Sequence, residues 1–182
     1  NKVFAGVRNI DKAKQQFSGY PELDFVRFDF EDAETFTEAL KDIDVVFLLR
    51  PPHIADVNTY FRPLIDRIRL RGINKVVFLS VQGAEKSKFI PHHKIENLIL
   101  ESGLKYVFLR PGYFMQNLTT TLYPDIQKRR KILLPAGKAK FNWIDVKNIG
   151  EAAALLCIEF EAHKNNAYEI TGSENLDFFE VT

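Results

Sequence analysis

Short apolar runs alternate with stretches of helical periodicity along almost the whole chain. Apolar runs of about five residues predict β-strands, and apolar residues that recur every three or four positions predict amphipathic helices. The run Val45–Leu49 is apolar throughout, which is typical of a central parallel strand. Because short connections join strands to helices, the pattern predicts a parallel sheet covered by helices on both faces. The predicted strands cover residues 2–7, 24–28, 45–49, 75–80, 105–110 and 167–170.

The predicted helices lie between these strands and after the last long one. Pro63 falls inside the helix marked by the stripe Phe61–Ile68, which therefore either begins near this proline or kinks there. Residues 113–122 also favour a helix, whereas residues 131–134 and 141–143 favour extended pieces around a turn. The other helices are predicted at residues 11–17 with Asp11 as N-cap, 32–40 with Asp32 as N-cap, 91–101, and 145–160 with Asp145 as N-cap.

The length of 182 residues suits one domain, which we divide into a core at residues 1–112 and a substrate-side segment at residues 113–182. The chain has 25 lysines and arginines and 24 aspartates and glutamates, so its formal net charge is +1. Such a balance gives no electrostatic reason to expect nucleic acid as a partner.

Cys157 is the only cysteine, which excludes an internal disulfide and suits a reducing compartment. No apolar run approaches the ~20 residues that a membrane-spanning helix needs, so we expect no membrane partner. No secretory leader is recognisable either. The expected location is therefore the cytoplasm.

Four of the predicted strands stop abruptly at residues suited to a ligand site. The carboxyl ends of parallel strands meet at one edge of an open α/β sheet, and such sheets bind their ligands at this edge. The repetition therefore predicts a nucleotide-type site. The four strands end at Arg8, at Pro51, at Ser80 and at the corner formed by Pro111 and Gly112.

A dinucleotide site needs a glycine-rich turn between its first strand and first helix, and this chain has only isolated glycines. Either the chain binds no nucleotide, or the first strand, the glycine turn and the first helix precede Asn1. Packing favours the second explanation, which leaves an open slot between the strands at residues 2–7 and 45–49. Since the lost burial would consume much of a typical stability of about 5–15 kcal/mol, we expect the 182 residues alone not to fold stably.

Six segments together resemble the NmrA-like branch of the atypical short-chain dehydrogenase/reductases. They are Ala5–Lys14, Asp44–Pro52, Val76–Gly83, His92–Glu96, Leu109–Leu118 and Pro135–Ile149. The resemblance implies an α/β fold: a Rossmann-type parallel sheet with helices on both faces, lacking its first strand and helix in this chain, plus a small C-terminal substrate-side region.

The resemblance implies an NADP(H)-dependent oxidoreductase that transfers hydride to a small flat acceptor such as a quinone. The alternative is a non-catalytic NADP(H)-binding sensor that regulates a protein partner. A sugar-nucleotide epimerase is disfavoured because such enzymes keep a Tyr-x-x-x-Lys pair, and Ile90 stands four residues before Lys94. NADP(H) is favoured over NAD(H) because Arg8 can offer a fork of donors to the adenosine 2′-phosphate.

The resemblance also implies which residues surround the cofactor. The adenosine end is assigned to Arg8, Asn9, Lys12, Asp29 and Phe30; the ribose and pyrophosphate to Leu49, Arg50 and Pro51; and the nicotinamide end to Ser80, Val81, Lys94, Pro111, Gly112, Tyr113 and Phe114. Simpler interpretations stay open: Arg8, Arg50 and Lys94 as surface charges, Phe30 and Phe114 as core residues, and Ser80 as a partner of nearby backbone groups.

Lys94 is the candidate catalytic residue, because it can hold the nicotinamide ribose although the usual tyrosine is absent. His92 or His93 can replace the tyrosine as a proton donor, since histidine titrates near neutrality. Adjacent histidines cannot both face one ligand, so no metal site is expected. The substrate pocket is assigned to Gln82, His92, His93, Asn117 and Trp143.

Overall fold

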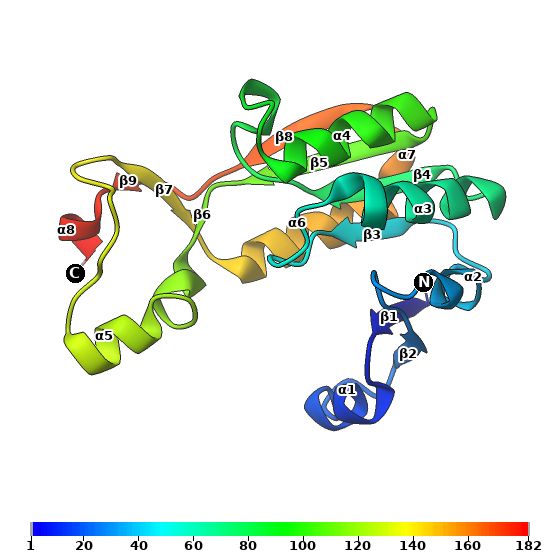
Figure 1. Ribbon diagram of the computed structural model, residues 1–182, viewed down its shortest axis with the longest axis horizontal. Coiled ribbons are helices and arrows are strands. Elements are labelled where there is room, and N and C mark those ends of the chain that lie inside the picture. Colours follow the sequence, from blue (N-terminus) through cyan, green and yellow to red (C-terminus); the bar gives the residue numbers. More distant parts are fainter. Residues whose placement is uncertain (1, 182) are drawn as a thin grey trace.

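The computed structural model describes residues 2–181, and Figure 1 shows the arrangement of its elements. The strands are β1 (Val3–Val7), β2 (Leu23–Arg27), β3 (Val46–Leu49), β4 (Lys75–Leu79), β5 (Lys105–Pro111), β6 (Tyr113–Phe114), β7 (Phe141–Ile144), β8 (Asn166–Ile170) and β9 (Asn175–Leu176). The α-helices are α1 (Ile10–Gln16), α2 (Phe36–Ala39), α3 (Val57–Leu70), α4 (Pro91–Ser102), α5 (Tyr123–Arg129), α6 (Val146–Ile158), α7 (Phe160–His163) and α8 (Phe178–Val181). In this part of the chain, no helix combines the length and apolarity that crossing a bilayer requires.

The main sheet has the strand order β3-β4-β5-β8, and every pair in it is parallel. Alternate residues of its strands point to opposite faces. Val76, Phe78 and Phe108 pack with α3 and α4 on one face, whereas Val77 and Val107 pack with α6 on the other. The expected α/β sheet with helices on both faces is therefore confirmed.

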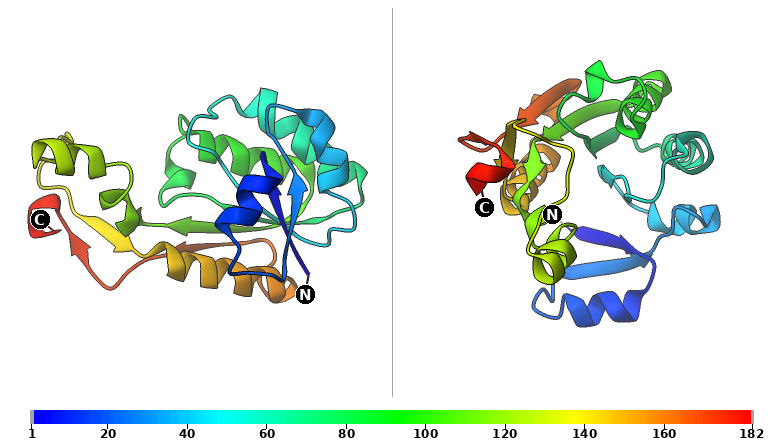
Figure 2. Two further views of the ribbon diagram at one scale, coloured as in Figure 1. Left: turned by 90° about the horizontal axis from the view of Figure 1, so that it is seen from below. Right: turned by 60° about the vertical axis from the view of Figure 1, so that its left-hand side comes forward.

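β1 and β2 form a separate parallel pair, which the left view of Figure 2 shows inclined to β5. This pair reaches the main core through aromatic residues that follow β2. The Phe28 ring stacks on Phe36 at a centroid distance of 5.3 Å, and the Phe30 ring lies 4.9 Å from that of Phe61 on α3. Aromatic packing, not strand pairing, joins the two sheets.

β1 and β3 each have an edge that pairs with no strand of residues 2–181, because β1 bonds only to β2 and β3 only to β4. Val3 and Phe4 of β1 are 57% and 38% exposed, and Phe47 and Leu49 of β3 are 41% and 47% exposed. Exposed apolar side chains beside unpaired backbone groups are unfavourable in a finished sheet. These edges agree with the open slot expected between the two strands.

A third sheet of order β6-β7-β9 lies beyond the end of β5. It carries an aromatic cluster in which Trp143 and Phe178 are buried and Tyr113 packs against both rings. Two glycines let the strands approach here. A Cβ on Gly112 would lie 2.5 Å from Asn142 O, and one on Gly172 would overlap Trp143 O.

Several sequence-predicted elements have different limits in the structure. Asn9, not Asp11, caps α1, because its side chain accepts a hydrogen bond from Lys12 N–H. The helix predicted at 32–40 is divided into a 3₁₀ turn (Ala33–Thr35) and α2. The helix predicted at 113–122 is wrong: β6 and a 3₁₀ turn (Met115–Leu118) occupy it, and α5 begins only at Tyr123. No strand forms at 131–134.

The helices α3 and α6 also differ from expectation at their ends. α3 begins at Val57 and continues through Pro63, so the carbonyl of Thr59 loses the N–H that would bond to it. Asp56 stabilises this early start, because its side chain accepts from Thr59 N–H at 3.0 Å. α6 ends at Ile158, two residues before Phe160, which belongs to α7.

We predict that β1 and β2 open independently of the main sheet. Their amides exchange with deuterium at least about tenfold faster than those of β4 and β5, because no ladder of hydrogen bonds joins the two sheets and local opening exposes little core. Hydrogen exchange with mass spectrometry measures this ratio. Equal protection of β1 and β4 would contradict it.

The low stability expected for the 182 residues as a whole stays a prediction.

Candidate functional site

The ends of three strands meet at one edge of the main sheet. Leu49, Leu79 and Leu109 are aligned across β3, β4 and β5 by the parallel register. Ser80 N–H donates to Leu109 O at 2.8 Å, so the pairing continues past the end of β4. The common edge predicted from the sequence is confirmed for these three strands, whereas Arg8 follows β1 in the other sheet.

Arg8 is exposed, and no residue of 2–181 forms a hydrogen bond or ion pair with its side chain. The neighbouring candidates are partly engaged in capping, since the Asn9 side chain accepts from Lys12 N–H at 2.9 Å. The Arg8 guanidinium is therefore free to bind an anion such as the adenosine 2′-phosphate.

The Arg50 guanidinium folds back onto the loop that follows β3. Its Nη1 donates to the carbonyl oxygens of Pro51, Pro52 and Ile54 at 3.0, 3.0 and 2.6 Å. Its Nε donates to His92 Nε2 at 3.5 Å, which links the loop to α4. Burial lowers the pKa of Arg50. These contacts make Arg50 a clamp on the loop, and they leave its Nη2 as the nitrogen with no partner in residues 2–181.

The two histidines at the start of α4 have different surroundings. His92 lies beside Arg50 and Phe78, and burial together with the Arg50 charge lowers its pKa to about 4. His92 is therefore neutral at pH 7 and serves as the acceptor for Arg50. His93 Nδ1 lies 2.9 Å from Ala84 O and must carry the proton of that hydrogen bond. The Nε2 atom of His93 has no hydrogen-bond partner in residues 2–181.

A buried ion pair fastens α4 to the end of β5. Arg110 Nε and Nη2 donate to the two oxygens of Glu96 at 3.0 and 2.7 Å, and Arg110 Nη1 lies 3.0 Å from Glu85 Oε2. The Glu96 side chain is only 4% exposed. The hydrogen bonds with Glu96 raise the pKa of Arg110. A bidentate pair of this geometry fixes both partners in orientation.

Ser80 has the one buried side-chain polar atom of residues 2–181 with no hydrogen-bond partner. The residue is 1% exposed and follows the end of β4 directly. A buried hydroxyl without a partner costs about 1–3 kcal/mol. Such an atom at the edge where α/β sheets bind ligands marks a group that a bound molecule would satisfy.

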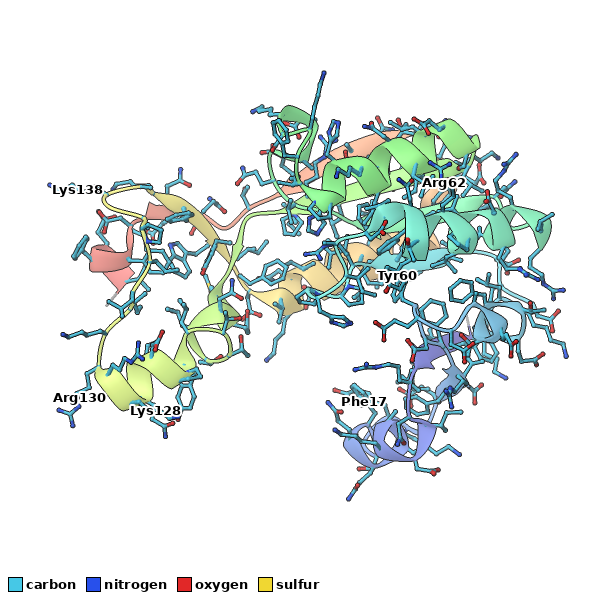
Figure 3. The ribbon with its side chains drawn as sticks, viewed as in Figure 1. Phe17, Tyr60, Arg62, Lys128, Arg130 and Lys138 are labelled. Carbon is cyan, nitrogen blue, oxygen red and sulfur yellow. The ribbon has the colours of Figure 1, made fainter. Side chains whose placement is uncertain are left out.

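Lys94, the candidate catalytic residue, lies near the start of α4. It is exposed on α4 and lines a groove of about 400 Å³ between α3 and α4, together with Asp56 and Arg62. Arg62 is labelled on α3 in Figure 3. The Lys94 charge contributes to the lowered pKa of Asp56, after the hydrogen bonds from Thr59. The structure thus places Lys94 with Asp56, and its assignment to the nicotinamide ribose stays a prediction.

The residues after β5 form a packed region. Trp143 is buried and its Nε1 donates to Leu176 O at 2.9 Å, and Tyr113 packs against its ring at 4.9 Å. Gly112 is required by the close approach of the Asn142 backbone, since a Cβ here would lie 2.5 Å from Asn142 O. Phe114 packs partly against the core on the α6 side.

The remaining candidates lie in mixed surroundings. Phe30 packs against the main core, which supports its interpretation as a core residue, and Asp29 accepts from Glu31 N–H in the same turn. Gln82 Nε2 donates to Glu169 Oε2 at 2.9 Å. Pro111 is buried, Leu49 is exposed, and the half-buried residues are Pro51, Val81 and Asn117.

The sequence interpretation missed Glu96, Arg110 and Glu85 as a unit. Glu96 stands four residues after His92, so both lie on one face of α4, and Arg110 is a charged residue at the end of an otherwise apolar strand. A charged side chain at the end of a buried strand needs a partner of opposite charge. This requirement could have indicated from the sequence that Arg110 pairs with an acidic residue.

A sequence profile of the NmrA-like family matches residues 1–179. The chain belongs to the NmrA-like family. It is 33% identical over 180 residues to prestalk A differentiation protein A of Dictyostelium discoideum, which covers 99% of this chain and 58% of that protein. It is 29% identical over 158 residues to an NAD(P)H azoreductase of Xenophilus azovorans, which covers 84% of this chain and 54% of that enzyme. The chain thus spans little more than half the length of these relatives.

Solved structures support the fold of this NmrA-like chain. An NADPH-dependent quinone oxidoreductase of Escherichia coli, complexed with NADPH, superposes with a TM-score of 0.83 at 22% identity, covering 100% of this chain and 64% of that one. A triphenylmethane reductase of Citrobacter sp., complexed with NADP(H), gives 0.80 at 21% identity, with 98% and 64% covered. At these identities the likeness establishes a Rossmann-like fold.

We predict that Glu96→Gln lowers the free energy of unfolding by about 3 kcal/mol, because it removes the buried charge that accepts two hydrogen bonds from Arg110 and leaves that guanidinium with the more exposed Glu85. Urea titration followed by circular dichroism measures the change. Asp125→Asn is the matched control: it removes the exposed pair with Arg129, whose expected effect is about 0–1 kcal/mol. Equal effects of the two substitutions would count against a buried ion pair.

We also predict that His92 makes stability depend on pH. Its folded pKa of about 4 lies below the ordinary 6.5, so the unfolded chain binds the proton more readily. Stability is therefore lost as the pH falls from about 6.5 to about 4, by roughly 1–2 kcal/mol after allowance for solvent screening. Urea titrations of the wild type and His92→Gln at pH 7 and pH 5 measure the difference. A His92 titration midpoint near 6.5 by NMR would refute the assignment.

Proposed function

We propose that this chain contributes to an NADP(H)-dependent oxidoreductase that transfers hydride to a small flat acceptor such as a quinone. The observation that carries the proposal is the buried, unpartnered Ser80 hydroxyl at the edge where three parallel strands end. Family membership supports it, since relatives and neighbours are named as NAD(P)H azoreductase and NADPH-dependent quinone oxidoreductase.

The residues present fit the two ends of such a cofactor. The free guanidinium of Arg8 suits the extra phosphate of NADP(H), because arginine presents a planar fork of donors to phosphate oxygens. Ser80 can donate its hydroxyl to the nicotinamide end. A binding turn for the pyrophosphate is missing from residues 2–181, since no glycine-rich turn follows a strand there. Arg50, clamped on its own loop, would orient that loop and not bind phosphate with Nη1.

When bound, NADPH supplies the hydride, and the protein's task is to hold and orient it. The proton donor usual in short-chain reductases is missing from its position, because Ile90 stands four residues before Lys94, and His92 with its pKa of about 4 is neutral at pH 7. A delocalised acceptor suits this site, because it can take hydride first and a proton from water later. Quinones have this property.

The same lack of a proton donor favours the second candidate function, a non-catalytic NADP(H) sensor. Such a protein binds the cofactor and changes its contacts with a protein partner, but transfers no hydride. Stopped-flow mixing of the NADPH-loaded protein with a panel of quinones separates the two. Oxidation of the bound NADPH supports the enzyme. Binding without oxidation by any acceptor supports the sensor.

We predict that Arg8→Glu weakens NADPH binding at least about tenfold more than NADH binding, because the substitution removes the partner of the 2′-phosphate and adds a repelling charge. Fluorescence titration with each nucleotide measures the ratio. Lys14→Glu on α1 is the control, since it makes the same charge change without facing the strand end. An unchanged ratio in Arg8→Glu would place the phosphate elsewhere.

A further inference from the structure

Positive charge is concentrated in one segment. Residues 127–140 hold six lysines and arginines and no acidic residue, in a chain whose formal net charge is +1. The rest of the chain is therefore net acidic. The segment includes the end of α5 and the loop that leads to β7, and Figure 1 places it at the end of the molecule far from β1 and β2. The net charge of +1 for the whole chain does not reveal that basic residues are concentrated in this segment.

Four of these basic side chains have no acidic partner within residues 2–181. They are Lys128, Arg130, Lys131 and Lys138, and all four are exposed. Arg129 and Lys140 differ, since they pair with Asp125 and Glu180. In Figure 3 the labelled side chains of Lys128, Arg130 and Lys138 point away from the body of the protein.

Two exposed leucines follow the basic run directly. Leu133 is 61% exposed and Leu134 is 40% exposed, whereas Ile126 and Ile132 face inward and pack against the aromatic cluster around Trp143. The inward isoleucines hold the segment to the body, and the leucines stay available on its outer side. Exposed aliphatic groups beside several unpaired cations suit a surface that is anionic outside and apolar beneath.

We propose that this basic end, defined as Lys128, Arg130, Lys131, Leu133 and Leu134, docks on the surface of an anionic lipid bilayer. The lysines and arginine attract the acidic headgroups, and the leucines enter the boundary between headgroups and acyl chains. Nucleic acid satisfies the charge but not the leucines, because bases bind to proteins by stacking on aromatic side chains. The proposal revises the expectation of no membrane partner, which considered only helices that span a bilayer and not docking on its surface.

Co-sedimentation of the protein with lipid vesicles tests the proposal. Vesicles of phosphatidylcholine with about one-third phosphatidylserine retain the protein at low salt, and vesicles of phosphatidylcholine alone retain at least about tenfold less. Raised salt weakens the retention. Equal binding to both vesicles, or to neither, overturns the proposal.

Two variants test which residues act. Lys128→Glu/Arg130→Glu/Lys131→Glu lowers retention at least about tenfold, because it reverses the charge of the docking surface. Its control, Lys14→Glu/Arg71→Glu/Lys88→Glu, makes the same change of net charge on exposed residues elsewhere and leaves retention within about twofold. Circular dichroism confirms that both variants are folded. Equal losses in the two variants overturn the assignment to the basic end.

The leucines and the competing partner have their own readouts. Leu133→Ser/Leu134→Ser reduces the retention that persists at raised salt, where the electrostatic part is screened. No loss in that variant overturns the insertion of the leucines. A fluorescent single-stranded oligonucleotide is the remaining probe. Tight binding of the oligonucleotide without retention on vesicles overturns the proposal in favour of a nucleic-acid surface.

Discussion

The structure depends on the buried ion pair between Arg110 and Glu96. The parallel register aligns the ends of β4 and β5, but it does not fix the position of α4, which packs against the sheet. Arg110 fixes α4, because it donates two hydrogen bonds to the Glu96 carboxylate on this helix. Its Nη1 also pairs with Glu85. The pair thereby positions His92, which in turn receives Arg50 and holds the loop after β3.

The same edge carries the features that suggest a ligand. A buried polar atom normally has a partner, and the Ser80 hydroxyl lacks one in residues 2–181. Arg8, which follows β1, has no partner in residues 2–181 and belongs to the part of the fold that aromatic packing joins to the main sheet.

Much of this fold could be predicted from periodicity. The apolar runs at 75–80 and 105–110 became β4 and β5, because continuous apolar runs suit strands buried on both faces. The helix expected at 113–122 failed because residues after Gly112 pair with β7, a long-range contact that local periodicity does not contain. The cap of α1 moved by two residues for a local reason, since Asn9 reaches the Lys12 N–H.

The candidate site was less predictable. The resemblance placed Ser80 and Arg8 at strand ends, and the structure keeps them there. It also assigned Lys94 to the nicotinamide end, which stays a prediction; the structure places this residue with Asp56 in the groove beside α3. The orientation of a residue on a helix depends on which face packs inward, and here the inward face is set by Ile95, Glu96 and Ile99. A partner for Arg110 could have been sought from its charge alone, but not identified as Glu96.

The nucleotide site proposed at the strand ends is tested most directly by hydrogen exchange in the presence of NADP⁺. We expect slower amide exchange at residues 80–82, at residues 112–114 and beside Arg8, and no change at the opposite edge of the sheet near Lys75 and Lys105. Protection confined to that opposite edge, or no protection anywhere at saturating nucleotide, would contradict the account.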